Sequence, residues 1–244
     1  MRFFVGLHQP SDAKNFEAVF VSVNRLRYRR GPFAVRDWIM DSGAFTTVNK
    51  HGGYPEPVSE YASHIKRWST NGNLLAAVAQ DYMCEPFVIA RTGLSIAEHQ
   101  RLTIERYDAL VACDTGGTYI MSVLQGYAPA DYVAHLAAYG KRLAHAAWVG
   151  VGSVCKRNGD ARAIESVLCA IKAVRPDLRL HGFGVKTTAL RSGLVRSMLE
   201  TADSMAWSFA ARRAGRNAND WREASAFRRV IDTMPVQLQL MEAY

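Results

Sequence analysis

Short apolar segments alternate with longer amphipathic segments along most of the chain. The short segments are rich in β-branched and aromatic residues and are apolar at almost every position. This pattern is typical of strands that are buried on both faces of a parallel sheet. We predict eight strands, at residues 2–7, 18–23, 37–40, 74–80, 119–124, 147–151, 178–183 and 202–207.

The amphipathic segments repeat their apolar residues at helical spacing. Within residues 56–68, for example, Val58, Tyr61, Ile65 and Trp68 fall on one face of a helix. The connection over residues 24–36 differs, because it is basic and is broken by Gly and Pro, and we expect a loop there. Further helices are predicted at residues 96–111, 130–143, 161–174, 188–199 and 221–231.

Alternating strands and helices predict a parallel sheet that is covered by helices. Eight strands favour a closed (β/α)₈ TIM-like barrel over an open sheet, and a single domain of 244 residues has the usual length of such a barrel. We therefore expect one domain over residues 1–244, with its core in residues 1–208. Residues 209–244 are predicted to form a C-terminal loop followed by a helix.

The chain is basic, with a formal net charge of +8, and 23 of its 30 basic residues are arginine. Arginine binds phosphate in a bidentate manner, so this charge favours a polyanionic partner. A GC-rich coding sequence also raises the arginine content, and a run of arginines is usually a solvated loop. The candidate phosphate contacts are Arg25, Arg27, Arg29, Arg30, Arg212 and Arg213, with Arg216 close to the last two.

The cysteines indicate neither a zinc site nor a redox pair. Cys84, Cys113, Cys155 and Cys169 are too far apart in sequence for a local metal motif. We expect them to be small buried residues in a reducing compartment. The N-terminal residues do not resemble a signal peptide, and no apolar run reaches about 18 residues. A cytoplasmic protein without a membrane span is expected.

Polar residues stand where several predicted strands end. Asp41 is followed by Ser42, and Asp81, Gln125 and Asp203 close or follow three other strands. The carboxyl ends of barrel strands surround one mouth, which is where catalytic groups lie in this fold. The sequence therefore predicts that these side chains share one pocket.

Several carboxylates around one pocket, without a pair of metal-ligating histidines, suit acid–base or covalent chemistry at an acetal-like carbon. Structural roles are possible for each residue alone. Asp41 could form an Asx turn, Asp203 could cap a turn, and Gln125 could satisfy backbone groups. His181 lies in an apolar strand and is more typical of a hydrogen-bonded core histidine than of a ligand.

A set of short motifs, in order between about residues 37 and 208, resembles the tRNA-guanine transglycosylase superfamily. The likeness is to its short DNA-modifying branch, the phage and bacterial DpdA-type transglycosylases. The motifs are Asp41-Ser42-Gly43-Ala44-Phe45, Asp81 within residues 79–86, Leu124-Gln125-Gly126, Val149-Gly150-Val151-Gly152, His181-Gly182-Phe183-Gly184-Val185 and Ala202-Asp203-Ser204.

The resemblance implies exchange of guanine for a 7-deazaguanine, such as 7-cyano-7-deazaguanine, with neither a cofactor nor a metal. It implies that Asp203 forms a covalent bond to C1′ of the target nucleoside and that Asp41 moves the proton. Asp81 would read the N1 and exocyclic amino edge of the base, and Gln125 the opposite edge. The further substrate contacts that it implies are Ser42, Phe45, Gly126, Gly150, Val151 and Gly152.

The chain departs from the tRNA enzymes of this superfamily, because their Cys-x-Cys-x-x-Cys cluster and downstream histidine are absent. That subdomain helps to dock tRNA, so its absence favours DNA as the substrate. Ala44 also replaces the second glycine of the first motif. The alternatives are an RNA substrate, a non-catalytic nucleic-acid-binding barrel that assists a separate enzyme, and a metal-dependent hydrolase. Partner proteins or a homodimer are also possible.

Overall fold

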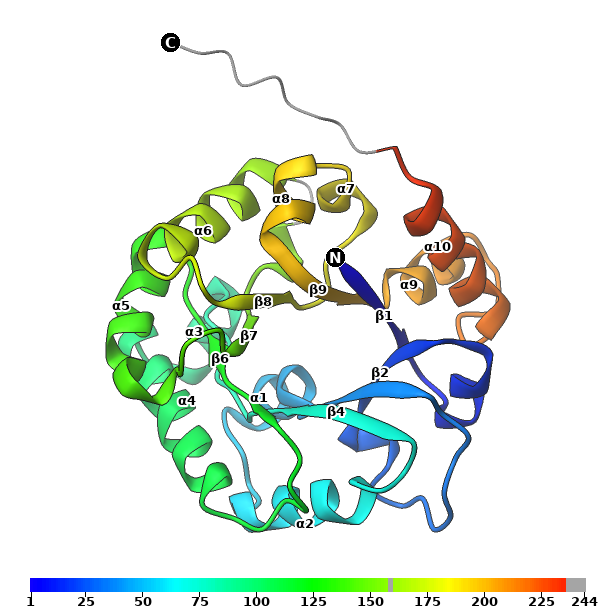
Figure 1. The fold of residues 1–244 in the computed structure, drawn as a ribbon, viewed down its shortest axis with the longest axis horizontal. Coiled ribbons are helices and arrows are strands. Elements are labelled where there is room, and N and C mark those ends of the chain that lie inside the picture. Colours follow the sequence, from blue (N-terminus) through cyan, green and yellow to red (C-terminus); the bar gives the residue numbers. More distant parts are fainter. Residues whose placement is uncertain (158–159, 236–244) are drawn as a thin grey trace.

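Parallel strands form a ring that is surrounded by helices (Figure 1). The computed structural model describes residues 1–157 and 160–235. The strands follow the order β5-β4-β3-β2-β1-β9-β8-β7-β6 in one sheet, and every pairing is parallel. Their bounds are β1 Arg2–Leu7, β2 Ala18–Ser22, β3 Asp37–Asp41, β4 Asn73–Val78, β5 Ile120–Met121, β6 Val123–Leu124, β7 Trp148–Val151, β8 Arg179–Gly182 and β9 Leu199–Ser204.

The ring closes through one extended run, residues 119–124, of which β5 and β6 are the two halves. Ala77 of β4 donates its N–H to Tyr119 O at 2.9 Å, and Gly150 of β7 donates to Ser122 O at 2.8 Å. The run is therefore bonded to both of its neighbours, as any strand inside a sheet is. Counted this way the ring has eight strands, and the predicted (β/α)₈-like barrel is confirmed.

Most helices cover the outside of the ring (Figure 1). The predicted helix at residues 56–68 is present as α2, which buries Tyr61, Ile65 and Trp68, and the connection over residues 24–36 contains no α-helix. The helices are α1 Ala44–His51, α2 Val58–Trp68, α3 Pro86–Thr92, α4 Ile96–Val111, α5 Pro129–Tyr139, α6 Ala161–Val174, α7 Thr187–Leu190, α8 Gly193–Met198, α9 Ala206–Arg213 and α10 Trp221–Thr233.

The last strand lies earlier in the sequence than predicted. The strand predicted at residues 202–207 is β9, Leu199–Ser204, and Trp207 belongs to α9. Pairing decides this boundary, because β9 pairs with β1 from Thr201 to Ser204 and the chain then turns into α9. The Trp207 indole donates to Gly6 O at 2.9 Å, which fixes the start of α9 against β1.

Two further expectations around β9 are wrong. Residue 209 does not begin a loop, because α9 runs through residues 206–213. The single helix predicted over residues 188–199 is two short helices, and Ser192 caps the second of them by accepting from Val195 N at 3.2 Å. The predicted helix at residues 221–231 is present as α10, and residues 236–244 of the predicted C-terminal region lie outside the described residues.

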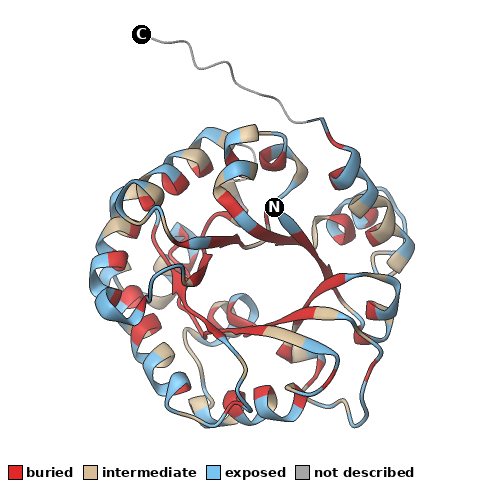
Figure 2. Cartoon of the chain, viewed as in Figure 1, coloured by how far each residue is buried: buried red, intermediate tan, exposed pale blue. Residues whose placement is uncertain are grey.

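Buried residues lie on the strands and on the sides of the helices that face them (Figure 2), and the apolar ones among them form two main clusters. One cluster lies inside the ring and includes Phe4, Ile39, Met121 and Trp148. A larger cluster joins the outer faces of the strands to the helices. Burial on both faces explains why these strands are apolar at almost every position. Among the described helices, none is long and apolar enough to cross a membrane.

The cysteines are less buried than expected. Cys84 is buried, Cys113 and Cys155 are half-buried, and Cys169 on α6 is exposed. The expectation of four buried cysteines is therefore wrong for Cys169. This residue is not among the buried residues of α6, which include Leu168 and Ile171, and its sulfur lies 3.8 Å from that of Met198.

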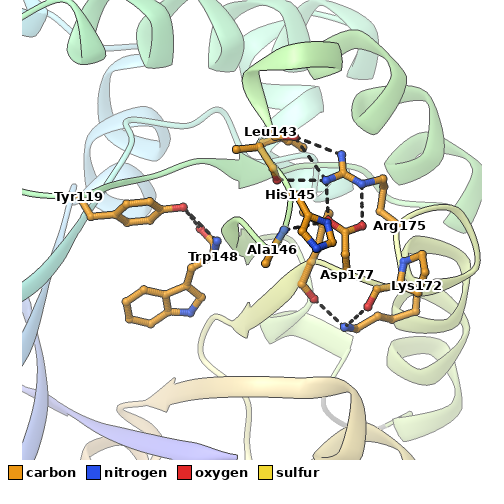
Figure 3. A network of polar contacts seen from close by, with 11 residues as sticks. Tyr119, Leu143, His145, Ala146, Trp148, Lys172, Arg175 and Asp177 are labelled. Atoms are coloured by element: carbon orange, nitrogen blue, oxygen red, sulfur yellow. Dashed lines mark hydrogen bonds and ion pairs between the residues drawn. The ribbon is translucent and has the colours of Figure 1, made fainter.

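Polar contacts pin the N-terminal ends of β7 and β8 (Figure 3). Asp177 accepts two hydrogen bonds from Arg175 at 2.8 Å and one from Ala146 N at 2.9 Å. The Arg175 hydrogen bond holds the pKa of Asp177 well below its usual value. Tyr119 accepts from Trp148 N at 3.0 Å and donates to Trp148 O at 2.9 Å. These contacts stabilise the end of the barrel opposite the strand carboxyl ends.

Asn71 anchors the basic connection between β2 and β3. Its side-chain oxygen accepts from Phe33 N at 3.1 Å, and its amide donates to Phe33 O at 3.1 Å. We predict that Asn71→Ala lowers the free energy of unfolding by about 2–3 kcal/mol, because it leaves two buried backbone groups unsatisfied. Urea denaturation measures this loss. Asn15→Ala removes one exposed bond and should cost less than about 0.5 kcal/mol; equal losses in both variants would contradict the prediction.

Candidate active site

The strand carboxyl ends surround a cavity of about 320 Å³. The three predicted acids, Asp41, Asp81 and Asp203, line it together with Gln125 and Glu85. A larger cavity of about 660 Å³ opens at the N-terminal end of the barrel, where the arginines nearby are paired with carboxylates. The smaller cavity is therefore the candidate site, because it gathers four acids at the end where barrel enzymes place their chemistry.

Asp41 is the last residue of β3 and is half-buried. The chain turns directly after it through Gly43, whose φ of 73° is a conformation that glycine adopts without strain. Burial raises the pKa of Asp41 to about 6; the Ser22 hydroxyl opposes the rise and the negative charge of Asp203 adds to it. Asp41 is thus suited to giving and taking a proton near neutral pH.

Asp81 follows β4 and is buried, with 6% of its surface exposed. Its Oδ2 accepts a short hydrogen bond from Gln125 Nε2. Burial raises the pKa of Asp81 to about 7; the Gln125 bond opposes the rise, and the charges of Asp41 and Glu85 add to it. Three acids thus affect one another across the cavity.

Asp203 lies one residue before the end of β9, with its side chain 8% exposed. Its Oδ1 accepts from Gly184 N at 3.0 Å and lies 3.3 Å from His181 Nε2. Both contacts go to the same oxygen, so the orientation of the carboxylate is fixed from one side.

His181 is fully buried behind Asp203. Its Nδ1 lies 2.8 Å from Thr201 Oγ1, which in turn accepts from Trp148 Nε1 at 2.9 Å. Because an indole N–H can only donate, the Thr201 hydroxyl is free to donate to Nδ1. A neutral His181 that accepts from Thr201 at Nδ1 carries its proton on Nε2, which lies 3.3 Å from Asp203 Oδ1. The ring also stacks on Phe20, with centroids 5.6 Å apart and planes at 15°.

Gln125 is fully buried between Asp81 and Ser153. Its Oε1 lies 2.7 Å from Ser153 Oγ, which lies 2.8 Å from Glu85 Oε2. Ser153 has a φ of 53°, a strained value for a residue with a side chain, and such strain is typical of functional sites. Glu85 was missed as a site residue in the sequence, and Ser153 was not among the predicted contacts. The available signal for Glu85 was its place four residues after Asp81, in the segment that follows β4.

The structure brings only part of the predicted contact set to the cavity. Asp41, Asp81, Gln125, Asp203, Phe45 and Gly152 line it. Ser42, Gly126, Gly150 and Val151 are not among the lining residues. Other side chains fill the space beside two of these glycines: a side chain at Gly126 would meet Tyr132, and one at Gly150 would overlap the ring of Phe183. Gly152 leaves room for the amide of Gln125.

The predicted phosphate contacts lie in different settings. Arg27 pairs with Glu56 and Glu60, and Arg29 donates to the carbonyls of Gly31 and Pro32. Arg30 is exposed. Arg212 and Arg213 stand on α9, and Arg216 pairs with Glu223.

Arg25 lines a neighbouring cavity of about 560 Å³ together with Lys50 and His51. Asp41 lines both this cavity and the smaller one, so cationic groups lie next to the acids. Among the residues that the structure describes, no cluster of three or more histidine, cysteine or acidic side chains could hold a metal ion.

A family model described as DpdA, deoxypurine in DNA protein A, matches residues 1–225. The chain belongs to the DpdA family. The resemblance inferred from the motifs is thereby confirmed, and membership supports a DNA-modifying transglycosylase in general terms. No curated protein matches the chain.

The raised pKa of Asp81 predicts a pH-dependent stability. An unfolded aspartate titrates near 3.9, so the native state holds the proton to higher pH and loses stability as pH rises from about 4 through about 7. Asp81→Asn keeps the acceptor for Gln125 and removes this loss. We expect the difference in free energy of unfolding between the variant and the wild type to grow, in favour of the variant, by about 3 kcal/mol from pH 5 to pH 8.

Thermal unfolding at pH 5, 6, 7 and 8 measures this gain. Asp232→Asn serves as the control, because Asp232 lies in an exposed ion pair with Arg228. A constant difference between Asp81→Asn and wild type across the four pH values would contradict the prediction.

Proposed function

We propose that the protein exchanges guanine in DNA for a 7-deazaguanine, such as 7-cyano-7-deazaguanine, through a covalent intermediate on Asp203. The observation that carries this proposal is that Asp203 and Asp41 line one cavity with Asp81 and Gln125. A nucleophile, a proton carrier and a pair of base-reading groups are the parts that a base exchange needs. Membership of the DpdA family agrees with this reaction class.

In the first step, Asp203 attacks C1′ of the target nucleoside and the C1′–N9 bond breaks. Because both hydrogen bonds of Asp203 go to Oδ1, we assign the attack to Oδ2. The electrons of the broken bond leave with guanine, and protonated Asp41 donates its proton to the departing base. The pKa of Asp41, about 6, leaves a useful protonated fraction near neutral pH.

In the second step, the incoming 7-deazaguanine gives its N9 proton to the Asp41 carboxylate. N9 then attacks C1′ and displaces Asp203, which returns to its ionised form. Two displacements at one carbon restore the original configuration. Asp41 ends the cycle with the proton that the first step requires, so no cofactor is consumed.

Asp81 and Gln125 are proposed to read the base. Guanine and 7-deazaguanine both present two donors, N1–H and the exocyclic amine, on one edge. The Asp81 carboxylate offers two acceptor oxygens to that edge, and the neighbouring Gln125 amide meets the 6-oxo side. Phe45 and Gly152 also line this cavity.

DNA is the proposed substrate, with the target nucleotide flipped out of the stack to reach the cavity. The cavity next to Asp41, with Arg25 and Lys50, would receive the flanking phosphates. RNA is the second candidate, and the same exchange assay on tRNA tests it. A non-catalytic barrel that assists a separate enzyme would form no covalent adduct.

We predict that wild-type protein transfers radiolabelled guanine into duplex DNA. Asp203→Asn should form no adduct and show no exchange, because it lacks the nucleophile. Asp41→Asn should slow exchange about 100- to 10,000-fold, because it cannot carry the proton. Scintillation counting of purified DNA and denaturing gels of trapped adducts measure both effects.

Asp37→Asn is a matched control for these variants. Asp37 stands at the opposite end of β3 from Asp41 and pairs with Arg2, so exchange should remain within about twofold of wild type. If Asp203→Asn exchanged guanine at the wild-type rate, the covalent mechanism would be wrong.

His181 is predicted to act as a positioning residue for Asp203. His181→Phe keeps the packing against Phe20 but removes the hydrogen bond to the carboxylate. The bond joins a charged group, so kcat for exchange should fall about 10- to 100-fold while KM for DNA stays within about twofold. His181→Gln, whose amide can still donate, should recover part of the rate. A rise in KM at unchanged kcat would show that His181 serves DNA binding instead.

A further inference from the structure

Glu85 is a buried acid in the candidate site that the proposed reaction does not use. Only 2% of its surface is exposed, and it lines the cavity directly. Within residues 1–157 and 160–235, no lysine, arginine or histidine forms an ion pair with it. A buried carboxylate without a cation is costly unless it is well hydrogen-bonded or carries a proton.

Glu85 ends a chain of four polar groups. Asp81 Oδ2 contacts Gln125 Nε2, Gln125 Oε1 contacts Ser153 Oγ at 2.7 Å, and Ser153 Oγ contacts Glu85 Oε2 at 2.8 Å. The N–H of Cys84 donates to the same Ser153 oxygen at 2.8 Å. The chain therefore has an acid at each end, with an amide and a hydroxyl between them.

The four linked polar groups have one hydrogen atom too few for their three contacts. Its three contacts need three donors, but the Gln125 amide supplies one and the Ser153 hydroxyl supplies one. When Gln125 donates to Asp81 and Ser153 donates to Gln125, the third hydrogen must come from Glu85. If the amide is reversed and Ser153 donates to Glu85, the missing hydrogen must come from Asp81. Without this third hydrogen atom, two oxygen atoms would face each other at hydrogen-bond distance with no hydrogen between them.

We propose that Asp81 and Glu85 share one proton through Gln125 and Ser153, and that Glu85 holds it whenever Asp81 reads a guanine-type base. Asp81 then accepts from N1–H and the exocyclic amine as a full carboxylate. The substrate class is the 2-amino-6-oxo purines and 7-deazapurines. This extends the proposed function and rests on it for the identity of the base.

Loss of the shared proton weakens base recognition. The Ser153 hydroxyl then turns to the Glu85 carboxylate, and Gln125 loses the donor that fixes its amide. Glu85 is thus a positioning residue that acts on the base through three other groups. Paired acids of this kind titrate as a unit rather than as two separate residues.

The surrounding ionisable groups do not supply this proton. Burial raises the pKa values of Cys84 and Tyr132 well above their usual range, so both stay neutral around pH 7. The titratable and charged groups around the pair are Asp41, Tyr54, Tyr61, Cys84, Asp131, Tyr132, Tyr139, Cys155 and Arg157.

The first test needs no substrate. Carbon-13 NMR of labelled Asp and Glu carboxyls follows both acids between pH 5 and pH 9, with Asp81→Asn and Glu85→Gln used for assignment. In wild-type protein we expect the two signals to move together, with one proton gained by the pair. Ser153→Ala should separate the two titrations, although it leaves both charges in place. Independent titration in wild type would overturn the proposal.

The second test measures guanine binding by calorimetry between pH 6 and pH 8.5. Wild-type affinity should fall by up to about tenfold per pH unit once the pair loses its proton. In Glu85→Gln the new amide donates to Ser153 permanently, so affinity should stay within about threefold across the range. Glu105→Gln, which removes an exposed acid paired with Arg101, should keep the wild-type profile.

The outcomes separate this inference from the proposed function. If Glu85→Gln lost guanine affinity more than about tenfold at pH 6.5, the carboxylate itself would contact the base and the shared proton would be refuted. If the acids titrate together but guanine neither binds nor exchanges, the shared proton stands and the proposed function falls. If guanine exchanges while the acids titrate independently, only the shared proton is refuted.

Discussion

Closure of the parallel ring is the constraint on which the site depends. Residues 119–124 hydrogen-bond to β4 on one side and to β7 on the other, so the sheet has no free edge at this point. All strands then end on one rim, and residues that are far apart in sequence, such as Asp41 and Asp203, face one cavity. An open sheet with the same strands would spread these acids along an edge.

Placing several acids in a small cavity is unfavourable for folding and useful for chemistry. Burial and like charge raise the pKa values of Asp41 and Asp81 toward neutrality. Asp203 is held differently, by the N–H of Gly184 and the ring of His181. The same acid side chain thus stands in different electrostatic surroundings within one cavity. The apolar layers inside and outside the ring must compensate for the acids that the rim buries.

The fold was predictable because the alternation of strand and helix patterns is repeated along the sequence. Eight apolar segments and the helices between them all indicate the same barrel. The helices α1 and α3 were not predicted, because α1 begins at a glycine turn and α3 begins at Pro86. Both are short and follow loops whose course depends on tertiary contacts. The boundary of β9 was missed because Trp207 looks strand-like in sequence, whereas its indole is bonded to Gly6 O.

The site was predictable at the level of its acids and less so at the level of their neighbours. Asp41, Asp81, Gln125 and Asp203 follow or end strands, and the fold rule then places them together. Ser153 stands in a loop where its contact with Glu85, 68 residues away in sequence, depends on the folded geometry. The motif glycines pack against other side chains, and the sequence does not show which ones.

Gly152 has a consequence for how this pocket could evolve. A side chain there would meet the amide of Gln125, so Gln125 would have to move or be replaced. Because that amide also contacts Asp81 and Ser153, such a change would disturb both contacts. Substitutions at positions 125 and 152 are therefore expected to occur together in the evolution of this pocket.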